Sequence, residues 1–318
     1  MVLMKFLKKF KRIKHNGWGA LKVSGGNISF AHVERRSGVM PAITAWVSQP
    51  LDLEADKAVH AFANAHSLNA RHCVVVLNRA EYQLLQVEAG KLTPAEAKQA
   101  VRWSIKDMLD YPVANATVDV LEIPFDSANL SRPRFMLAIA ARNEVIRERI
   151  VRFIDSTSTG LEAIDIAETG QRNIAALLEQ QDRGLALLSF NDEGGLLTFT
   201  AGGELYHSRQ LYITAEQLQT KDEAHLSVVY ERVALDLQRT LDNFGRQFSY
   251  VVVNRLLLAP FGMRSGLVDF LKSYLSLPVD TFELADIFNV ESVPQLADVA
   301  MQSRAFTLLG VALREDRA

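Results

Sequence analysis

The clearest pattern of hydrophobic and polar positions lies between residues 93 and 124. A Thr-Pro-Ala-Glu sequence opens it, which favours a capped helix with proline at the first helical position, where a missing N–H costs nothing. Pro112 keeps the residue before it out of the helical region and ends the element. We therefore expect a helix over 94–110 and then an alternating strand over 116–123. The apolar stripe of this helix consists of Ala97, Val101, Ile105 and Met108.

The same reading of the hydrophobic period along the rest of the chain predicts an α/β protein with mixed sheets. Strands are expected over 18–24, 27–36, 42–48, 72–77, 82–87, 116–123, 134–141, 161–166, 184–190, 195–200, 204–212 and 249–257. Helices are expected over 54–67, 94–110, 143–157, 168–181, 214–244, 264–275 and 303–314. One design occurs twice, near 19–36 and near 184–211: a strand, a glycine-containing turn and a second strand, which pair as a hairpin.

Composition and charge exclude several classes of protein. With 318 residues and 48% hydrophobic content, the chain is long enough to bury two or more subdomains. The net charge of -2 and the pI near 6.4 argue against a nucleic-acid-binding protein. No run is long and apolar enough to span a membrane, and the start lacks the features of a signal peptide. We therefore expect a cytoplasmic location.

Residues with catalytic or metal-binding chemistry are not arranged in any recognisable motif. Cys73 lies in an apolar strand run, which favours a buried, reduced thiol over a nucleophile or a metal ligand. The histidines lack the spacing of metal ligands, and no serine has a base and an acid placed around it. We predict no catalytic residue and no metal site.

The first residues carry the one strong charge asymmetry, with no acidic residue before Glu34. In a helix they would have a cationic face and an apolar edge, the pattern of a segment that lies on an anionic membrane surface. The residues that would contact such a surface are Lys5, Phe6, Lys8, Lys9 and Phe10. A solvated tail and a contact with an acidic partner are the other two interpretations.

Four segments, in order and spread over nearly the whole chain, carry a resemblance to a known family. They are AVRWSIKDMLDYPV at 100–113, VDVLEIP at 118–124, LEAIDIAETGQRNIAALL at 161–178 and AFTLLGVALRE at 305–315. They resemble PilM-like proteins of type IV pilus inner-membrane platforms, and most closely the MshI group of mannose-sensitive haemagglutinin (MSHA) pilus systems. The resemblance implies the fold of actin-like ATPases of the FtsA and PilM kind, with two lobes and an inserted small α+β subdomain.

The resemblance also implies a domain organisation. Residues 1–14 would be a basic tail, and residues 46–145 would form the inserted subdomain of FtsA/PilM type. The first lobe would combine 15–45, 146–182 and 303–318. The second lobe would occupy 183–302.

In actin-like ATPases two hairpin turns cradle phosphate, and an acidic residue near each turn positions a metal ion. The resemblance places these turns at Ser24, Gly25, Gly26 and Asn27, and at Asp192, Gly194 and Gly195. The first turn has no aspartate, the second strand carries Ser189 before a late acidic pair, and the adenine-side segment 254–262 is not glycine-rich. We expect a degenerate site without ATP turnover, and binding of ATP with magnesium remains the alternative.

The family binds the cytoplasmic N-terminal peptide of a membrane-anchored PilN-like protein in a groove between the first lobe and the inserted subdomain. The candidate partner residues here are Phe30, His32, Trp103, Tyr111 and Arg209. Aromatic residues of this kind occur at interface centres, but they also pack into cores, and core packing is the commoner fate for Phe30. A structural ion pair is an equal alternative for Arg209.

The function expected from these observations is that of a cytoplasmic scaffold, peripheral to the inner membrane, in an MSHA-type pilus platform. It would bind a PilN-like protein and other platform proteins, with no nucleic acid as partner. An ATP-dependent conformational switch of the same machine is one alternative. The other is a scaffold like the cytoplasmic region of GspL from type II secretion, although that family continues into a membrane helix and this chain ends at Ala318 without one.

Overall fold

The computed structural model describes residues 16–315, apart from 52–55, 90–93, 127–128, 130–131, 156–158 and 261–265. The chain folds into two compact units. Unit 1 is drawn from 1–35, 44–169 and 311–318, and unit 2 from 36–43 and 170–310.

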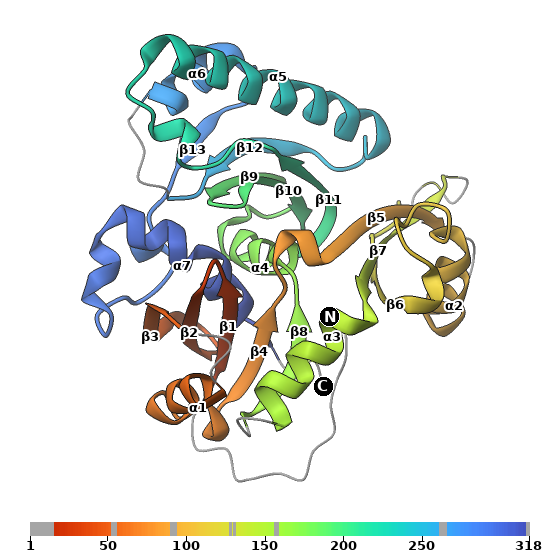
Figure 1. Cartoon of the computed structure of the whole chain (residues 1–318). Coiled ribbons are helices and arrows are strands. Elements are labelled where there is room, and N and C mark those ends of the chain that lie inside the picture. Colours follow the sequence, from red (N-terminus) through yellow and green to blue (C-terminus); the bar gives the residue numbers. More distant parts are fainter. Residues whose placement is uncertain are drawn as a thin grey trace. The chain divides into compact units, whose positions relative to one another are not determined.

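Unit 1 is built on a five-stranded sheet with the order β3-β2-β1-β4-β8 (Figure 1). β1 and β2 form an antiparallel hairpin, whereas β4 runs parallel to both β1 and β8. The strands are β1 (Trp18–Ser24), β2 (Asn27–Arg36), β3 (Val39–Pro50), β4 (His72–Val76) and β8 (Leu161–Asp165). β4 has the continuous apolar sequence that a strand covered on both faces requires.

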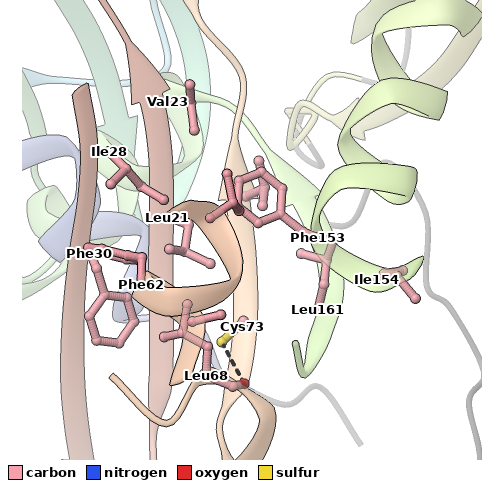
Figure 2. Packing of buried hydrophobic residues seen from close by; sticks show 13 residues of the cluster. Leu21, Val23, Ile28, Phe30, Phe62, Leu68, Cys73, Phe153, Ile154 and Leu161 are labelled. Carbon is pink, nitrogen blue, oxygen red and sulfur yellow. Dashed lines mark hydrogen bonds between the residues drawn. The ribbon is translucent and has the colours of Figure 1, made fainter. Parts of the chain in front are cut away.

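Helix α1 (Asp56–Ala65) and the segment after helix α3 (Asn143–Ile150) pack against this sheet and complete its core. Figure 2 shows Phe30 and Leu21 of the hairpin packed with Phe62 and Phe153. Cys73 lies among them, with its thiol 3.6 Å from the Leu68 carbonyl oxygen, and burial raises the pKa of this thiol to about 12. The predicted buried thiol is confirmed.

A second, three-stranded antiparallel sheet in unit 1 has the order β5-β7-β6. Its strands are β5 (Tyr82–Ala89), β6 (Ala116–Glu122) and β7 (Arg134–Arg142), and helix α2 (Pro94–Ser104) packs on it. This small sheet begins at Tyr82, later than the insertion limit of 46 that the sequence suggested. β4 lies before that point and pairs between β1 and β8, so it belongs to the first sheet.

Helix α2 begins at Pro94 as predicted but ends at Ser104 and not at 110. After that residue the Met108 N–H bonds to Ile105, three residues back, so the chain tightens into turns. Met108 is 49% exposed and leaves the predicted apolar stripe, while Val101 and Ile105 are buried.

Unit 2 has a five-stranded sheet of the same design, with the order β11-β10-β9-β12-β13. β9, β10 and β11 are antiparallel, and β12 runs parallel to β9 and β13, so both predicted hairpin repeats are confirmed. The strands are β9 (Gly184–Asn191), β10 (Gly194–Ala201), β11 (Glu204–Leu211), β12 (Val253–Leu258) and β13 (Val279–Thr281). The three-residue β13 was not predicted.

The remaining helices occur near their predicted ranges, but α3 ends at 150 and not at the predicted 157. They are α3 (Asn143–Ile150), α4 (Ala167–Leu178), α5 (Glu223–Gln247), α6 (Gly266–Tyr274) and α7 (Val299–Ala312). α5, the long teal helix in Figure 1, starts nine residues later than expected because the Asp222 side chain caps it by accepting the Ala224 and His225 N–H groups. Short 3₁₀ turns occur at Leu68–Ala70, Arg79–Glu81, Val113–Asn115, Gln217–Gln219, Leu284–Asp286 and Pro294–Ala297, and a π turn at Val151–Asp155.

Candidate functional site

The first hairpin turn, in unit 1, is a structural glycine turn without an acidic residue. Gly25 and Gly26 have φ values of 55° and 72°, which is the requirement of a two-residue type I′ hairpin. Asn27 donates from its side-chain amide to the Gly25 carbonyl at 3.2 Å, and Leu51 donates its N–H to Gly26 at 2.9 Å. Ser24 is half-buried beside the turn. None of the turn residues 24–27 is acidic.

The second hairpin turn, in unit 2, is stabilised by a hydrogen bond between its own residues. The Glu193 N–H donates to the Asn191 side-chain oxygen at 2.8 Å, and Asp192 is exposed at the tip. Gly194 has a φ of 122°, and a Cβ there would lie 2.7 Å from a backbone oxygen. At Gly195 a Cβ would lie 2.6 Å from the Phe190 ring. These glycines are required by backbone conformation and packing.

Ser189, just before that turn, points into a buried polar cluster and not toward the turn. Its hydroxyl donates to the Gln171 side-chain oxygen at 2.6 Å. The Gln171 amide nitrogen in turn lies 2.6 Å from the Leu187 carbonyl, 3.0 Å from that of Leu196 and 3.0 Å from the Thr198 hydroxyl. We call Gln171, Ser189 and Thr198 the Gln171 cluster. Every member has a partner, so the serine has a structural role.

Two buried carboxylates that the motif analysis did not single out lie where β8 meets α4 in unit 1. Asp165 accepts hydrogen bonds from the Ile166 N–H at 2.9 Å and from the Thr169 hydroxyl, and Arg314 binds its other oxygen at 3.0 Å. Glu168 is 1% exposed and accepts the Tyr82 hydroxyl. We call Asp165 and Glu168 the acidic junction. The sequence signal was the acidic turn inside LEAIDIAETG, but nothing in it identified the partners.

Burial controls the protonation of the second carboxylate. Desolvation raises the pKa of Glu168, and it raises the pKa of Tyr82 well above its ordinary value, with the neighbouring Glu168 charge adding to the effect. Both oxygens of the Asp165 carboxylate are engaged by protein donors. Within the part of the chain that the structure describes, no group of three or more His, Cys, Asp or Glu side chains is placed to hold a metal ion.

The segment expected on the adenine side is largely not a loop. Val253–Leu258 forms β12, and Leu256, Leu257 and Leu258 are buried in the sheet. Arg255 donates to the Leu178 carbonyl at the end of α4, at 2.7 Å. The described residues of this segment therefore contribute to the sheet of unit 2.

Three of the five candidate partner residues are buried, and two are exposed. Phe30 and His32 are both 0% exposed, Phe30 in the core of Figure 2 and His32 bonded to Thr44, so neither presents a surface to a partner. The core alternative for Phe30 is confirmed. In unit 2, Arg209 is exposed on β11, and the ion pair considered as an alternative for it is not among the contacts of the described residues.

Trp103 and Tyr111 also differ from each other. Trp103 is 70% exposed on α2, whereas Tyr111 is 9% exposed and belongs to the core of the small sheet. The Arg142 guanidinium lies 4.1 Å from the centre of the Tyr111 ring. It also lies 3.4 Å from the Asp110 carboxylate, which in turn is 3.4 Å from the Gln83 side-chain nitrogen. We call these four residues, Gln83, Asp110, Tyr111 and Arg142, the Tyr111 cluster.

The residues predicted to contact a membrane surface, Lys5, Phe6, Lys8, Lys9 and Phe10, lie outside the described residues. Among the helices of the described part, none has the length and hydropathy needed to cross a bilayer.

Comparison with known proteins gives a fold but no sequence family. No family model matches the chain, and no curated protein sequence matches it. A chain of a solved PilM-PilN type IV pilus biogenesis complex aligns over 94% of this chain and 99% of that one, with a TM-score of 0.70 and 17% identity. The fold is PilM-like. The predicted α/β fold of actin-like ATPase type is thereby confirmed.

Two further solved structures align with this chain at lower scores. One is the cytoplasmic domain of EpsL, an inner-membrane component of the type II secretion system of Vibrio cholerae, with a TM-score of 0.43, 11% identity and coverage of 65% of this chain and 79% of that one. The other is a Bacteroides thetaiotaomicron protein of unknown function with an actin-like ATPase fold, with a TM-score of 0.46, 9% identity and coverage of 89% and 96%. The fold assignment rests on the first structure.

Proposed function

We propose that this protein is a non-catalytic, PilM-like scaffold of a type IV pilus assembly platform. It binds the cytoplasmic N-terminal peptide of a PilN-like inner-membrane protein. The observation that carries the proposal is the close match of nearly the whole chain to the chain from the PilM-PilN complex. Because the identity is 17%, the match concerns the fold, and the partner is inferred from the function of that complex.

The local chemistry of both hairpins supports a scaffold over an ATPase. A metal-dependent ATPase needs carboxylates that are free to bind the metal or its water. Ser24 and Ser189 stand where such carboxylates were expected, and the Ser189 hydroxyl is already bound by Gln171. In the acidic junction, Arg314 binds Asp165 and Tyr82 binds Glu168. These contacts stabilise the fold and engage both carboxylates of the acidic junction.

The finer assignment follows the segment resemblance. We place the protein in an MSHA-type platform, in the cytoplasm and at the inner membrane, where other platform proteins are further partners. The basic residues 1–14 would add a weak, salt-sensitive attachment to anionic lipid. Vesicle sedimentation of the full chain and of a form lacking these residues tests this point. Equal binding of both forms would exclude the tail as the attachment.

Calorimetry with two ligands tests the proposed function. The first ligand is a synthetic peptide with the cytoplasmic N-terminal sequence of the host's PilN-like protein, and the second is ATP with magnesium. We expect saturable binding of the peptide, no binding of a scrambled peptide, and no saturable binding of ATP below millimolar concentration.

Each ligand can contradict a different part of the proposal. A low-micromolar dissociation constant for ATP, equivalent to about -8 kcal/mol, would support the nucleotide-dependent switch and exclude the scaffold without nucleotide. Absence of peptide binding at concentrations up to a millimolar would exclude the PilN-like partner.

A further inference from the structure

The Tyr111 cluster brings two polar atoms to one end of the small sheet without giving them a protein partner. The Tyr111 hydroxyl and the Gln83 side-chain oxygen are both buried, and neither makes a hydrogen bond to another described residue. Their neighbours are connected: the Gln83 nitrogen faces Asp110, Asp110 faces Arg142, and Arg142 covers the Tyr111 ring. Buried polar groups are nearly always paired in folded proteins, so this pair of atoms requires an explanation.

The chemistry of the two atoms matches a polypeptide main chain. The Gln83 oxygen can only accept a hydrogen bond, as from a peptide N–H, while the Tyr111 hydroxyl can donate one to a carbonyl oxygen. Gln83 lies on β5, which is an edge strand of the order β5-β7-β6. An edge strand already presents main-chain groups to an extended segment, which is how many domains bind peptides.

The Arg142 side chain is the part of the cluster that can open it. Arg142 is the last residue of β7, and its side chain is 47% exposed. Its contact with Asp110 is long, at 3.4 Å, and the Asp110 side chain is 67% exposed. Solvent-exposed ion pairs of this kind hold a side chain weakly. Tyr111 belongs to the core of the small sheet and Arg142 lies over its ring, so we expect a ligand that reaches the hydroxyl to displace Arg142 and not the ring.

We propose that Gln83 and Tyr111 bind the main chain of an extended peptide, with Gln83 accepting a peptide N–H and Tyr111 donating to a peptide carbonyl. Arg142 moves aside when the peptide binds. This inference rests on the proposed function, because the peptide is the N-terminal segment of the PilN-like partner. The peptide-binding atoms of the small sheet, the Gln83 oxygen and the Tyr111 hydroxyl, are called the recognition point. The exposed Trp103 is not part of it.

The first test replaces Tyr111 by phenylalanine, which removes the hydroxyl and keeps the packed ring. We expect the dissociation constant of the PilN-like peptide to rise about three- to tenfold, the range of one lost neutral hydrogen bond. The thermal midpoint of the free protein should stay unchanged or rise, because an unpaired buried hydroxyl is removed. Tyr206→Phe makes the same change in unit 2, where Tyr206 is 7% exposed, and should leave peptide affinity unchanged.

The second test uses Gln83→Met together with peptides that are N-methylated at one residue at a time. Methylation of the peptide nitrogen that donates to Gln83 should weaken binding to the unaltered protein about three- to tenfold. The same methylation should not weaken binding to Gln83→Met further, because that variant has already lost this hydrogen bond. Arg142→Ala should strengthen peptide binding, since the side chain that must move is absent.

The outcomes separate this inference from the proposed function. If the unaltered protein binds the peptide and Tyr111→Phe, Gln83→Met and Arg142→Ala bind it equally well, the function stands and the recognition point is excluded. If Tyr111→Phe lowers the thermal midpoint and leaves affinity unchanged, a bridging water occupies the site and the inference is wrong. If the unaltered protein binds no peptide at all, both proposals fail.

Discussion

The acidic junction of unit 1 and the Gln171 cluster of unit 2 both pair buried polar side chains, the first with a charged partner and the second with neutral ones. Both hold buried polar side chains, and helix α4 contributes residues to each. In unit 1 the partner of Asp165 is Arg314, which lies 149 positions away in the sequence. In unit 2 the partners of Gln171 lie within 27 positions. The first cluster depends on charge and on a distant segment, and the second on neutral groups of adjacent strands.

This difference indicates where each unit is most sensitive. A buried ion pair is costly to form, and removing one partner leaves an uncompensated buried charge. Removing one member of a buried amide network costs less stability than removing one partner of a buried ion pair. Replacing all members of the network by apolar groups can leave the stability nearly unchanged. We therefore expect unit 1 to be sensitive to single charge removals and to pH, and unit 2 to be sensitive to changes that leave one member without its partners.

The largest effect is expected for Arg314→Met. The Arg314 side chain is 12% exposed, that of Asp165 is 6% exposed, and the guanidinium also lies over the Trp18 ring. Its loss leaves the Asp165 carboxylate buried without its cation, which should lower the free energy of unfolding by about 3–5 kcal/mol. Urea unfolding measures this change.

The neighbouring Glu315 provides the control for that experiment. It pairs with Arg35 at 3.0 Å, and both side chains are well exposed. Glu315→Gln should therefore cost less than about 1 kcal/mol. If Arg314→Met lowers the free energy of unfolding by no more than Glu315→Gln does, the acidic junction does not depend on the Arg314 cation.

An intermediate effect is expected for Gln171→Leu. The substitution removes the side-chain partner of the buried Ser189 and Thr198 hydroxyls, and it removes the amide donor to the Leu187 and Leu196 carbonyls. The free energy of unfolding should fall by about 2–3 kcal/mol. Adding Ser189→Ala and Thr198→Val should recover part of this loss, because the unpaired hydroxyls are then removed. A triple variant no more stable than Gln171→Leu alone would contradict the neutral-network interpretation.

The smallest effect is expected for Glu168→Gln and appears as a difference in pH dependence. Tyr82, Arg79 and Asp165 surround Glu168, and burial raises the pKa of this carboxyl above its ordinary value of 4.5. The folded protein therefore holds the proton more tightly than the unfolded chain does. The resulting stability is full below pH 4.5 and is lost as pH rises through the raised pKa.

Urea unfolding of the unaltered protein and of Glu168→Gln from pH 4 to pH 8 measures the contribution of Glu168 to stability. The unaltered protein should lose stability relative to Glu168→Gln as pH rises, with a slope of at most about 1.4 kcal/mol per pH unit, the limit for one proton. Parallel curves for the two proteins would show that Glu168 does not titrate in this window.

Much of the fold could be predicted because local signals agreed with the final structure. The hairpin at Gly25 and Gly26 needs positive φ values that glycine supplies, and β4 has the apolar run of a covered strand. The end of α2 was predicted wrongly. Pro112 marks a place where a helix must have ended, but it does not prevent an earlier end, and the turns after Ser104 begin before it.

The candidate site was less predictable from the sequence. Phe30, Tyr111 and Trp103 are all aromatic residues in patterned segments, yet they are 0%, 9% and 70% exposed. Gln83 and Arg142 have no motif around them, and only the pairing of β5 with β7 brings them to Tyr111. A sequence pattern gives the period of an element, but the burial of one side chain depends on what packs over it.

The sequence by itself determined the order of strands and helices apart from β13, the two glycine hairpins, the buried thiol of Cys73 and the resemblance to a PilM-like protein. These features depend on backbone preferences and on apolar period, which act over a few residues. The tertiary structure decided that Arg314 binds Asp165, that Ser189 serves Gln171, and that Tyr111 and Gln83 keep unpaired atoms at one end of the small sheet. Each of these contacts joins residues of different segments, from 18 positions apart for Ser189 and Gln171 to 149 for Arg314 and Asp165, so their chemistry exists only after the sheets have formed.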